Sequence, residues 1–305
     1  MMRTQPAWAG VFPAVTTQMR DDESVDLDAT ARHVRWLVDE GVHGLIMLGT
    51  VGEACSLEPA EKLDVLKAAK EAAGGRVPVL SGVAEYTPRL ACRHAEACAK
   101  LGIDGLMVLP PMVYRTDRGE TLAHFRSVAA ATDLPIMIYN NPVTYGVDTT
   151  PEMFVELADV ASIVAIKESS DDVRRITDLH NATGQRYRLF CGVDDLVLES
   201  QMLGIAGSVA GLVNAFPAET LRLWQLGAAG RFAEAVHLYR WFADLLHLDT
   251  KPKLVQYIKL VQALVGRGSE VCRAPRGRIS GAERAMVEGI VNRALAARPP
   301  LRDAA

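Results

Sequence analysis

Lys167 ends an apolar run, residues 163–166, that is typical of a buried strand. A lysine amine removed from water either loses its proton more readily or takes up a partner charge. In its neutral form the amine is a nucleophile that forms imines with carbonyl substrates. The alternative is structural, with the ammonium paired with Glu168 or another carboxylate, or reaching water past the strand end.

A tyrosine ends the preceding apolar run. Tyr139 follows residues 135–138, and Lys167 comes 28 residues later, which is the length of one strand-helix-strand unit. In a parallel sheet the two side chains would lie at matching ends of neighbouring strands. The phenol could then exchange protons with the amine, so the pair predicts lysine-dependent carbonyl chemistry.

Short apolar runs alternate eight times with longer amphipathic stretches along the chain. Helix starts are signalled by Asp26, by Thr87 before Pro88 and by Thr150 before Pro151. Eight βα units favour a closed (β/α)8 TIM barrel, whereas a doubly wound open sheet is the alternative. The predicted strands cover residues 11–16, 44–48, 77–82, 105–109, 136–140, 163–167, 187–191 and 207–213.

Helical patterns continue beyond the eighth unit, whose own helix lies near residues 217–226. The last part of the chain predicts three helices over residues 231–247, 252–265 and 281–297. We therefore predict a catalytic barrel over residues 1–227 and a C-terminal helical extension over 228–305, in one structural unit. Such a helical cap could serve contacts between subunits.

Composition restricts the classes of function. The chain has 305 residues, 49% of them hydrophobic and 23% charged, with a net charge of −4, as in ordinary globular proteins. The absence of a basic stripe argues against a nucleic-acid partner. Residues 1–20 contain neither a secretion signal nor an apolar run that could span a membrane, so we expect no membrane partner and a cytoplasmic location.

The cysteines and histidines lack the spacing of metal sites. Five cysteines without a CxxC pair indicate reduced thiols, and no HExxH, phosphate-binding or EF-hand motif occurs. We therefore expect no metal and no cofactor other than a covalent imine on Lys167. The cysteines are Cys55, Cys92, Cys98, Cys191 and Cys272.

The residues that follow the predicted strands would surround one end of the barrel. Residues 49–53 follow strand two, and their glycines allow a tight turn that leaves backbone N–H groups and the Thr50 hydroxyl free for a carboxylate. An ordinary βα turn is the alternative. The small residues of strand eight leave room for a ligand. The expected substrate-binding residues are Gly49, Val51, Gly192 and Val209.

Four motifs occur in a fixed order: GTVGE at 49–53, YNNP at 139–142, IKESS at 166–170 and GVDD at 192–195. Together they resemble the family of lysine-dependent pyruvate-type lyases that includes dihydrodipicolinate synthase and N-acetylneuraminate lyase, over almost the entire chain. The resemblance implies a (β/α)8 barrel with a C-terminal helical extension, assembled as a homotetramer from two dimers.

The same resemblance implies roles for three side chains. Lys167 would form a Schiff base with the keto carbon of a 2-oxo acid such as pyruvate, and Tyr139 would relay protons. Thr50 and its loop would hold the substrate carboxylate. A protonated imine is an electron sink, so a proton can leave C3 and a group can leave or join at C4.

Three positions depart from the synthase pattern. Thr144 stands where the synthase has an arginine that holds a second carboxylate, and Val51 replaces a hydroxyl residue. The tyrosine that the synthase borrows from the adjoining subunit falls at Val113, one residue before Tyr114. Loss of a bidentate clamp weakens anion binding by a few kcal/mol, which argues against the synthase reaction as the main activity.

Residues 8–17, 167–175 and 239–242 resemble a catabolic branch of the family that includes the deaminase of 1-pyrroline-4-hydroxy-2-carboxylate. In that chemistry a cyclic imine transfers to Lys167, a C3 proton is lost and the 4-hydroxyl leaves as water. Hydrolysis then releases a semialdehyde and ammonia. We therefore predict a Schiff-base lyase that dehydrates and deaminates a hydroxylated 2-oxo acid or its cyclic imine.

Other functions remain alternatives. Within the family these are 4-hydroxy-tetrahydrodipicolinate synthase and an aldolase of 2-keto-3-deoxy sugar acids. A barrel enzyme acting on sugar phosphates is disfavoured because Asp194 and Asp195 would repel phosphate. A non-enzymatic 2-oxo acid binding or sensory protein would not need both Tyr139 and Lys167.

Four further residues have structural interpretations. Glu53 is expected to anchor the loop after strand two, and Cys191 to belong to the core. Tyr114 is expected to cover a subunit interface, although it could replace the missing relay phenol. Asp194 is expected to cap the helix that follows it.

Overall fold

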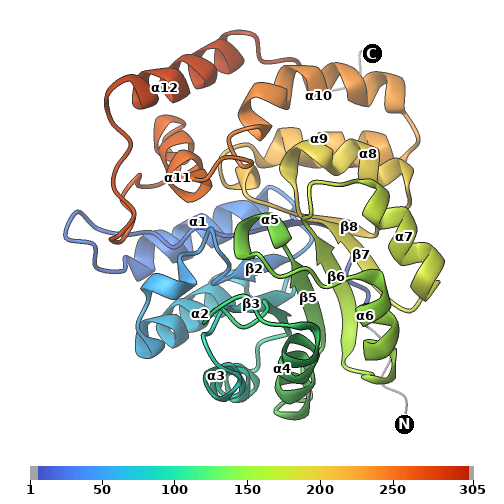
Figure 1. The fold of residues 1–305 in the computed structure, drawn as a ribbon. Helices are drawn as coiled ribbons and strands as arrows, with labels where there is room; N and C mark the ends of the chain where they lie inside the picture. The colour runs from blue at the N-terminus through green and yellow to red at the C-terminus, as the bar shows by residue number, and fades with distance from the viewer. Residues whose placement is uncertain (1–5, 302–305) are drawn as a thin grey trace.

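The computed structural model of the protein describes residues 6–301, so residues 1–5 and 302–305 of the predicted domains lie outside it. Eight parallel strands form one sheet in the order β1-β8-β7-β6-β5-β4-β3-β2. A parallel bridge between Ala14 and Ile46 joins the two outer strands and completes the barrel (Figure 1). The predicted (β/α)8 architecture is confirmed.

Each predicted strand is present, with small differences at the ends. The strand interiors are almost wholly buried, because barrel side chains pack either inward or against the surrounding helices. The predicted strand 207–213 is too long, since residues 212–214 form the short 3₁₀ turn η4 (Leu212–Asn214). The strands are β1 (Gly10–Pro13), β2 (Leu45–Met47), β3 (Val79–Val83), β4 (Gly105–Val108), β5 (Ile136–Asn140), β6 (Ile163–Glu168), β7 (Arg188–Cys191) and β8 (Gly207–Ala210).

Helices cover the outside of the barrel and begin where the sequence signals predict. Asp26 accepts the Ala29 N–H at 2.8 Å, and Thr87 caps the helix that begins at Pro88. The short helix α5 (Pro142–Tyr145) was not predicted. The other barrel helices are α1 (Leu27–Asp39), α2 (Pro59–Ala73), α3 (Pro88–Leu101), α4 (Arg118–Ala130), α6 (Pro151–Glu156), α7 (Arg174–Thr183), α8 (Val197–Met202) and α9 (Pro217–Ala228).

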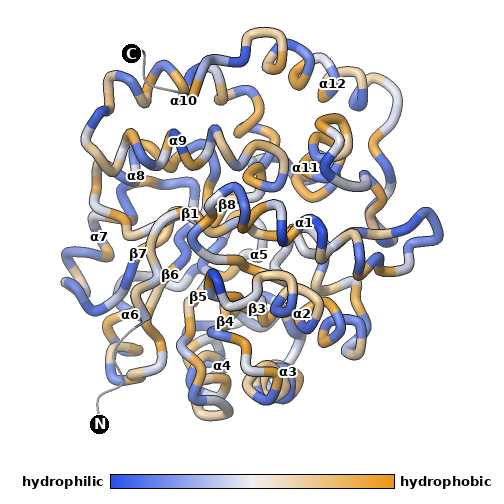
Figure 2. Tube along the Cα trace, turned by 180° about the vertical axis from the view of Figure 1, so that it is seen from behind, coloured by the Kyte–Doolittle hydropathy of each residue, from blue (hydrophilic) through white to orange (hydrophobic). Residues whose placement is uncertain are grey.

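The C-terminal extension consists of the three predicted helices, α10 (Phe232–Leu246), α11 (Leu254–Leu264) and α12 (Gly281–Ala296). They lie together beside α8 and α9 (Figure 1). Orange and blue alternate along α9 and α10 in Figure 2, as expected of helices with one apolar face. The apolar faces meet in a second core cluster that contains Phe216, Phe242, Leu245, Val261 and Val287.

Within residues 6–301, no helix combines the length and the apolar character needed to cross a bilayer. All five cysteines are free thiols. Cys191 is buried, and burial raises the pKa of its thiol to about 11, which agrees with a place in the core.

Candidate active site

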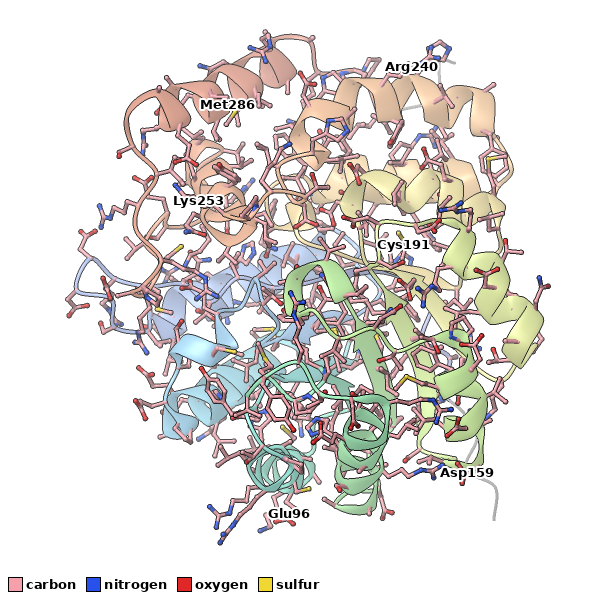
Figure 3. The ribbon with its side chains drawn as sticks, in the orientation of Figure 1. Glu96, Asp159, Cys191, Arg240, Lys253 and Met286 are labelled. Atoms are coloured by element: carbon pink, nitrogen blue, oxygen red, sulfur yellow. The ribbon has the colours of Figure 1, made fainter. Side chains whose placement is uncertain are left out.

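A cavity of about 370 Å³ opens at the C-terminal ends of the strands. It lies where (β/α)8 enzymes hold their substrates. Figure 3 labels Cys191 and Lys253, which directly precede two residues of the cavity wall, Gly192 and Leu254. All seven residues predicted for the site line this one cavity: Gly49, Thr50, Val51, Tyr139, Lys167, Gly192 and Val209. Their chemical roles remain predictions.

Lys167 and Tyr139 are direct neighbours in the register of β5 and β6. The Lys167 Nζ lies 3.9 Å from the centroid of the Tyr139 ring, and each residue is 5% exposed. Glu168, on the opposite face of the strand, accepts hydrogen bonds from Asn140 Nδ2 at 3.0 Å and the Ser170 N–H at 2.7 Å. Lys167 forms no ion pair within the described chain, so the structural alternative of a Lys167–Glu168 pair is not observed.

Gly192 lies against Lys167 and Ser169 and leaves the space that their side chains occupy. A Cβ added to Gly192 would come within 2.0 Å of Ser169 Oγ and 2.5 Å of Lys167 Cε. Ser169 is 2% exposed, and its hydroxyl has no hydrogen-bond partner among residues 6–301 although the residue lines the cavity. Ser169 was missed by the sequence interpretation, although its place two residues after Lys167 puts it on the same strand face.

The short helix α5 brings a second phenol to the site. The Tyr145 and Tyr139 rings meet edge to face with centroids 5.9 Å apart, and the Tyr145 hydroxyl forms a short hydrogen bond with Thr50 Oγ1. Burial raises the pKa of Tyr145, so its phenol stays protonated. Asn141 starts this helix by accepting the Thr144 N–H at 2.8 Å, and its Nδ2 donates to the Tyr139 hydroxyl at 3.0 Å.

Tyr145 could have been found from the sequence. Asn141 and Pro142 are a typical helix start, and Gly146, with φ of 71°, is a typical helix end. Together they mark one turn of helix directly after the strand that ends in Tyr139. Such a turn places its last residue close to the strand end.

The loop after β2 differs from the prediction in one respect. The Thr50 hydroxyl is not free, because it is hydrogen bonded to Tyr145. The backbone N–H groups of Thr50 and Val51 donate to no other residue in the described part of the chain, and both residues line the cavity. These N–H groups, rather than the hydroxyl alone, are therefore the available donors for a carboxylate.

Glu53 anchors this loop, as predicted. Its Oε1 lies 2.7 Å from Lys259 Nζ, and both side chains are completely buried. Lys259 also donates to the Thr17 carbonyl at 2.9 Å, and the Arg273 N–H donates to Glu53 Oε2 at 2.9 Å. The loop is thus tied to α11 and to the segment before α12.

The prediction for Asp194 is wrong. Its carboxylate does not cap α8 but accepts the N–H groups of Gly211 at 3.0 Å and Leu212 at 2.8 Å. These two bonds hold the turn η4 and explain why β8 ends at Ala210. Burial raises the pKa of Asp194 to about 6.

The C-terminal extension contributes part of the cavity wall, which the sequence interpretation missed. The segment between α10 and α11 includes Asp249, whose pKa is raised well above its ordinary value by burial and by the Asp194 charge. The residues of the extension that line the cavity are Asp249, Thr250, Lys251, Pro252 and Leu254.

The departures from the synthase pattern are visible in the cavity. Thr144 lines it, and the positively charged side chains of the described lining are those of Lys167 and Lys251. Tyr114 lies outside the lining, is 57% exposed and donates its hydroxyl hydrogen to Glu120. In residues 6–301, no three His, Cys, Asp or Glu side chains come together as a metal site would require.

Comparisons with known proteins agree with this geometry. Residues 7–294 match the model of the dihydrodipicolinate synthetase family. The chain is 37% identical over 216 residues to an uncharacterized DapA-like lyase of Halobacterium salinarum, covering 71% of each chain. It is 32% identical to a 4-hydroxy-tetrahydrodipicolinate synthase of Sphingopyxis alaskensis, covering 92% of this chain and 97% of the relative.

Solved structures show the same fold. A putative dihydrodipicolinate synthetase from Pseudomonas aeruginosa has a TM-score of 0.89 at 27% identity, with 94% of this chain and 99% of that chain covered. The E. coli protein YagE, solved in complex with pyruvate, has a TM-score of 0.89 at 25% identity, with the same coverage. The chain therefore belongs to the dihydrodipicolinate synthetase family of enzymes.

Proposed function

We propose that the protein is a Schiff-base lyase that dehydrates and deaminates a hydroxylated 2-oxo acid or its cyclic imine, such as 1-pyrroline-4-hydroxy-2-carboxylate. The observation that carries the proposal is the unpaired amine of Lys167 over the ring of Tyr139, inside a cavity of about 370 Å³. The pyruvate complex of YagE supports a 2-oxo acid as the substrate class.

The reaction begins with the substrate carboxylate on the N–H groups of Thr50 and Val51. The Lys167 amine attacks C2 and displaces the ring nitrogen, which leaves as a primary amine on C5. Tyr139 moves the protons of this exchange, and the hydrogen-bonded hydroxyl groups of Tyr145 and Thr50 lie beside its ring.

The later steps use the iminium as an electron sink. A C3 proton leaves, and the enamine electrons then expel the C4 hydroxyl as water. The product is an allylic amine, which loses a proton from C5 and gains one at C3 to become an enamine of C4 and C5. Protonation of this enamine at C4 gives an imine, and one water hydrolyses it to an aldehyde and ammonia. A second water hydrolyses the Lys167 imine, so the net reaction consumes one water and releases a 2-oxo acid semialdehyde and ammonia.

The named relatives favour a second candidate, the 4-hydroxy-tetrahydrodipicolinate synthase reaction. That reaction adds a second substrate that carries its own carboxylate. The cavity lining includes Thr144 and two acidic side chains, Asp171 and Asp249, and the charge of Asp195 acts nearby, where such a carboxylate would need cations. Besides Lys167, which forms the imine, Lys251 is the cation of the described lining, so dehydration of a single anion fits better.

Product analysis tests the choice between these reactions. The purified protein is incubated with 1-pyrroline-4-hydroxy-2-carboxylate, and in parallel with pyruvate and aspartate semialdehyde. We expect stoichiometric ammonia and semialdehyde from the first mixture and a rate lower by about a hundredfold or more from the second. Faster consumption of pyruvate with the aldehyde would replace the deaminase proposal with the synthase.

The assembly is a separate proposal. Val113, Tyr114 and Val143 expose 57%, 57% and 65% of their surface around the same end of the barrel, which supports burial of this region between subunits of a homotetramer. Light scattering should give the mass of four chains, and a monomer mass would contradict this.

The free state of all five cysteines supports a reducing, cytoplasmic location.

A further inference from the structure

Asp249 comes from the extension but lies against the barrel strands. A Cβ added to Gly211 would come within 2.8 Å of Asp249 Oδ1, so the carboxyl group occupies space that any residue other than glycine would fill. Asp249 lines the same cavity as Lys167, and the Lys167 charge acts on it. The segment between α10 and α11 thus places an acidic group beside the proposed imine.

The carboxyl groups of Asp249 and Asp194 meet at Gly211, because Asp194 Oδ1 accepts the Gly211 N–H at 3.0 Å and Asp249 Oδ1 lies 2.8 Å from where a Gly211 Cβ would be. Two carboxylates in such contact cannot both be ionised, so they share one proton. Asp194 accepts the N–H groups of Gly211 at 3.0 Å and Leu212 at 2.8 Å, and these donors favour its ionised form. The shared proton therefore resides on Asp249.

Other charged groups surround the pair on each side. Asp195, next in the chain, adds negative charge, and His247 Nε2 lies 3.5 Å from its carboxylate. Lys167 from β6 and Lys251 from the same segment as Asp249 supply positive charge. Asp171, after β6, faces the same region. The pair is thus a proton-bearing site between two cations and two further carboxylates.

We propose that Asp249 is the general acid that protonates the departing hydroxyl group, with Asp194 as the residue that positions it. This inference rests on the proposed dehydration. The unpartnered Ser169 hydroxyl, buried beside Lys167 and lining the same cavity, is a second observation that points to a polar ligand.

In the dehydration step the electron pair of the enamine forms the C3–C4 double bond, and the C4–O bond breaks with its electrons on oxygen. The oxygen takes the Asp249 proton and leaves as water, because hydroxide is a poor leaving group without protonation. Asp249 is then a carboxylate, and solvent returns its proton after the product leaves.

The test uses Asp249→Asn, which keeps the shape and removes the proton. Pyruvate allows the earlier steps to be followed alone, by borohydride trapping of the imine and by exchange of its methyl protons in D2O. We expect both to stay within about twofold of the wild-type protein, whereas dehydration of the hydroxylated substrate falls by about a hundredfold. Lys253→Gln, in the same segment but outside the cavity, is the control for disturbance of the segment.

A substrate with fluoride in place of the C4 hydroxyl separates an acid from a merely structural residue. Fluoride leaves without a proton, so Asp249→Asn should eliminate it within about threefold of the wild-type rate. Equal loss of fluoride and water elimination, or unchanged dehydration in the variant, would overturn the inference. A wild-type protein without any trapped imine would overturn the proposed function and this inference with it.

Asp194→Asn provides a second variant if Asp249→Asn does not fold. Removal of the neighbouring charge allows Asp249 to lose its proton at lower pH. The pH above which dehydration declines should therefore move downward, while exchange of pyruvate protons keeps its profile. An unchanged dehydration profile would contradict the proton-sharing pair.

Discussion

The two walls of the cavity differ in their chemistry. The wall after β2 presents N–H groups of Thr50 and Val51 and the phenol of Tyr145, all of them donors. The opposite wall presents the carboxyl group of Asp249, and Asp194 lies buried behind it at Gly211. A substrate with a carboxylate at one end and a leaving hydroxyl at the other would be held in one orientation, because each wall repels or fails to bind the wrong end.

Both walls depend on the C-terminal extension, in different ways. Lys259 of α11 supports the first wall through a completely buried pair with Glu53, whereas Asp249 forms the second wall directly. The extension is therefore part of the site as well as a cover for α8 and α9. The barrel strands thus place the amine, whereas the extension determines much of what surrounds it.

The largest effect is expected at the residue between the walls. Lys167→Met removes the nucleophile and keeps an unbranched side chain, so turnover should fall by about a thousandfold or more while the fold persists. Turnover assays and thermal melting check this. The exposed control Lys253→Met should retain wild-type turnover. Residual activity of Lys167→Met above about a tenth of wild type would contradict Lys167 as the nucleophile.

Tyr139→Phe tests the proton relay at the same position. We expect turnover to fall by about a hundredfold, because proton transfer by a positioned side chain contributes this much or more. Borohydride should still trap an imine, only more slowly. Unchanged proton exchange of pyruvate in this variant would show that another group does the work of Tyr139.

The support of the first wall is tested by Lys259→Met. The change leaves Glu53 buried without its cation, so the free energy of unfolding should fall by about 3–5 kcal/mol. Urea denaturation measures this, and the substrate KM should rise because the N–H groups lose their fixed position. The double variant Lys259→Met with Glu53→Gln should recover much of the stability, and failure to do so would point to packing instead of charge.

Tyr145→Phe tests the phenol that the first wall gains from α5. Loss of its hydrogen bond to Thr50 should lower turnover by about tenfold. Tyr114→Phe is the matched control, because that hydroxyl contacts Glu120 outside the cavity lining. Equal effects of the two changes would contradict the assignment of Tyr145 to the site.

A buried histidine outside both walls should give the smallest effect. Burial lowers the pKa of His124 from its ordinary value of 6.5 to about 4. Below pH 6.5 the unfolded chain therefore binds a proton that the folded protein does not, so the free energy of unfolding falls as the pH drops from 6.5 toward 4. Between pH 7 and 5.5 this loss is about 1 kcal/mol. His124→Gln should remove that part of the slope in denaturation measured at both pH values, and exposed His237→Gln should not.

The sequence was sufficient for the barrel because its signals are local. The alternation of apolar and amphipathic runs, the glycines in turns and the helix caps predicted every strand. The length of one strand-helix-strand unit predicted that Tyr139 and Lys167 would be neighbours. The same local reasoning failed at Asp194, since an aspartate before a helix looks like a cap. In the structure the Asp194 carboxylate instead accepts the N–H groups of Gly211 and Leu212.

Distant contacts could not be predicted. Asp249 approaches Gly211 only because the extension folds back over the barrel, and no nearby pattern marks it as a cavity residue. The Thr50 hydroxyl was expected to be free, because the helix of one turn that carries its partner, Tyr145, was not predicted. Residues brought together by packing of separate elements require the structure.

The covalent step can be measured directly. The protein is incubated with pyruvate or the hydroxylated pyrroline, reduced with borohydride, digested and sequenced by mass spectrometry. We expect one stable adduct, located on Lys167 and absent from Lys167→Met. An unchanged mass with every oxo acid, or an adduct on another lysine, would contradict it.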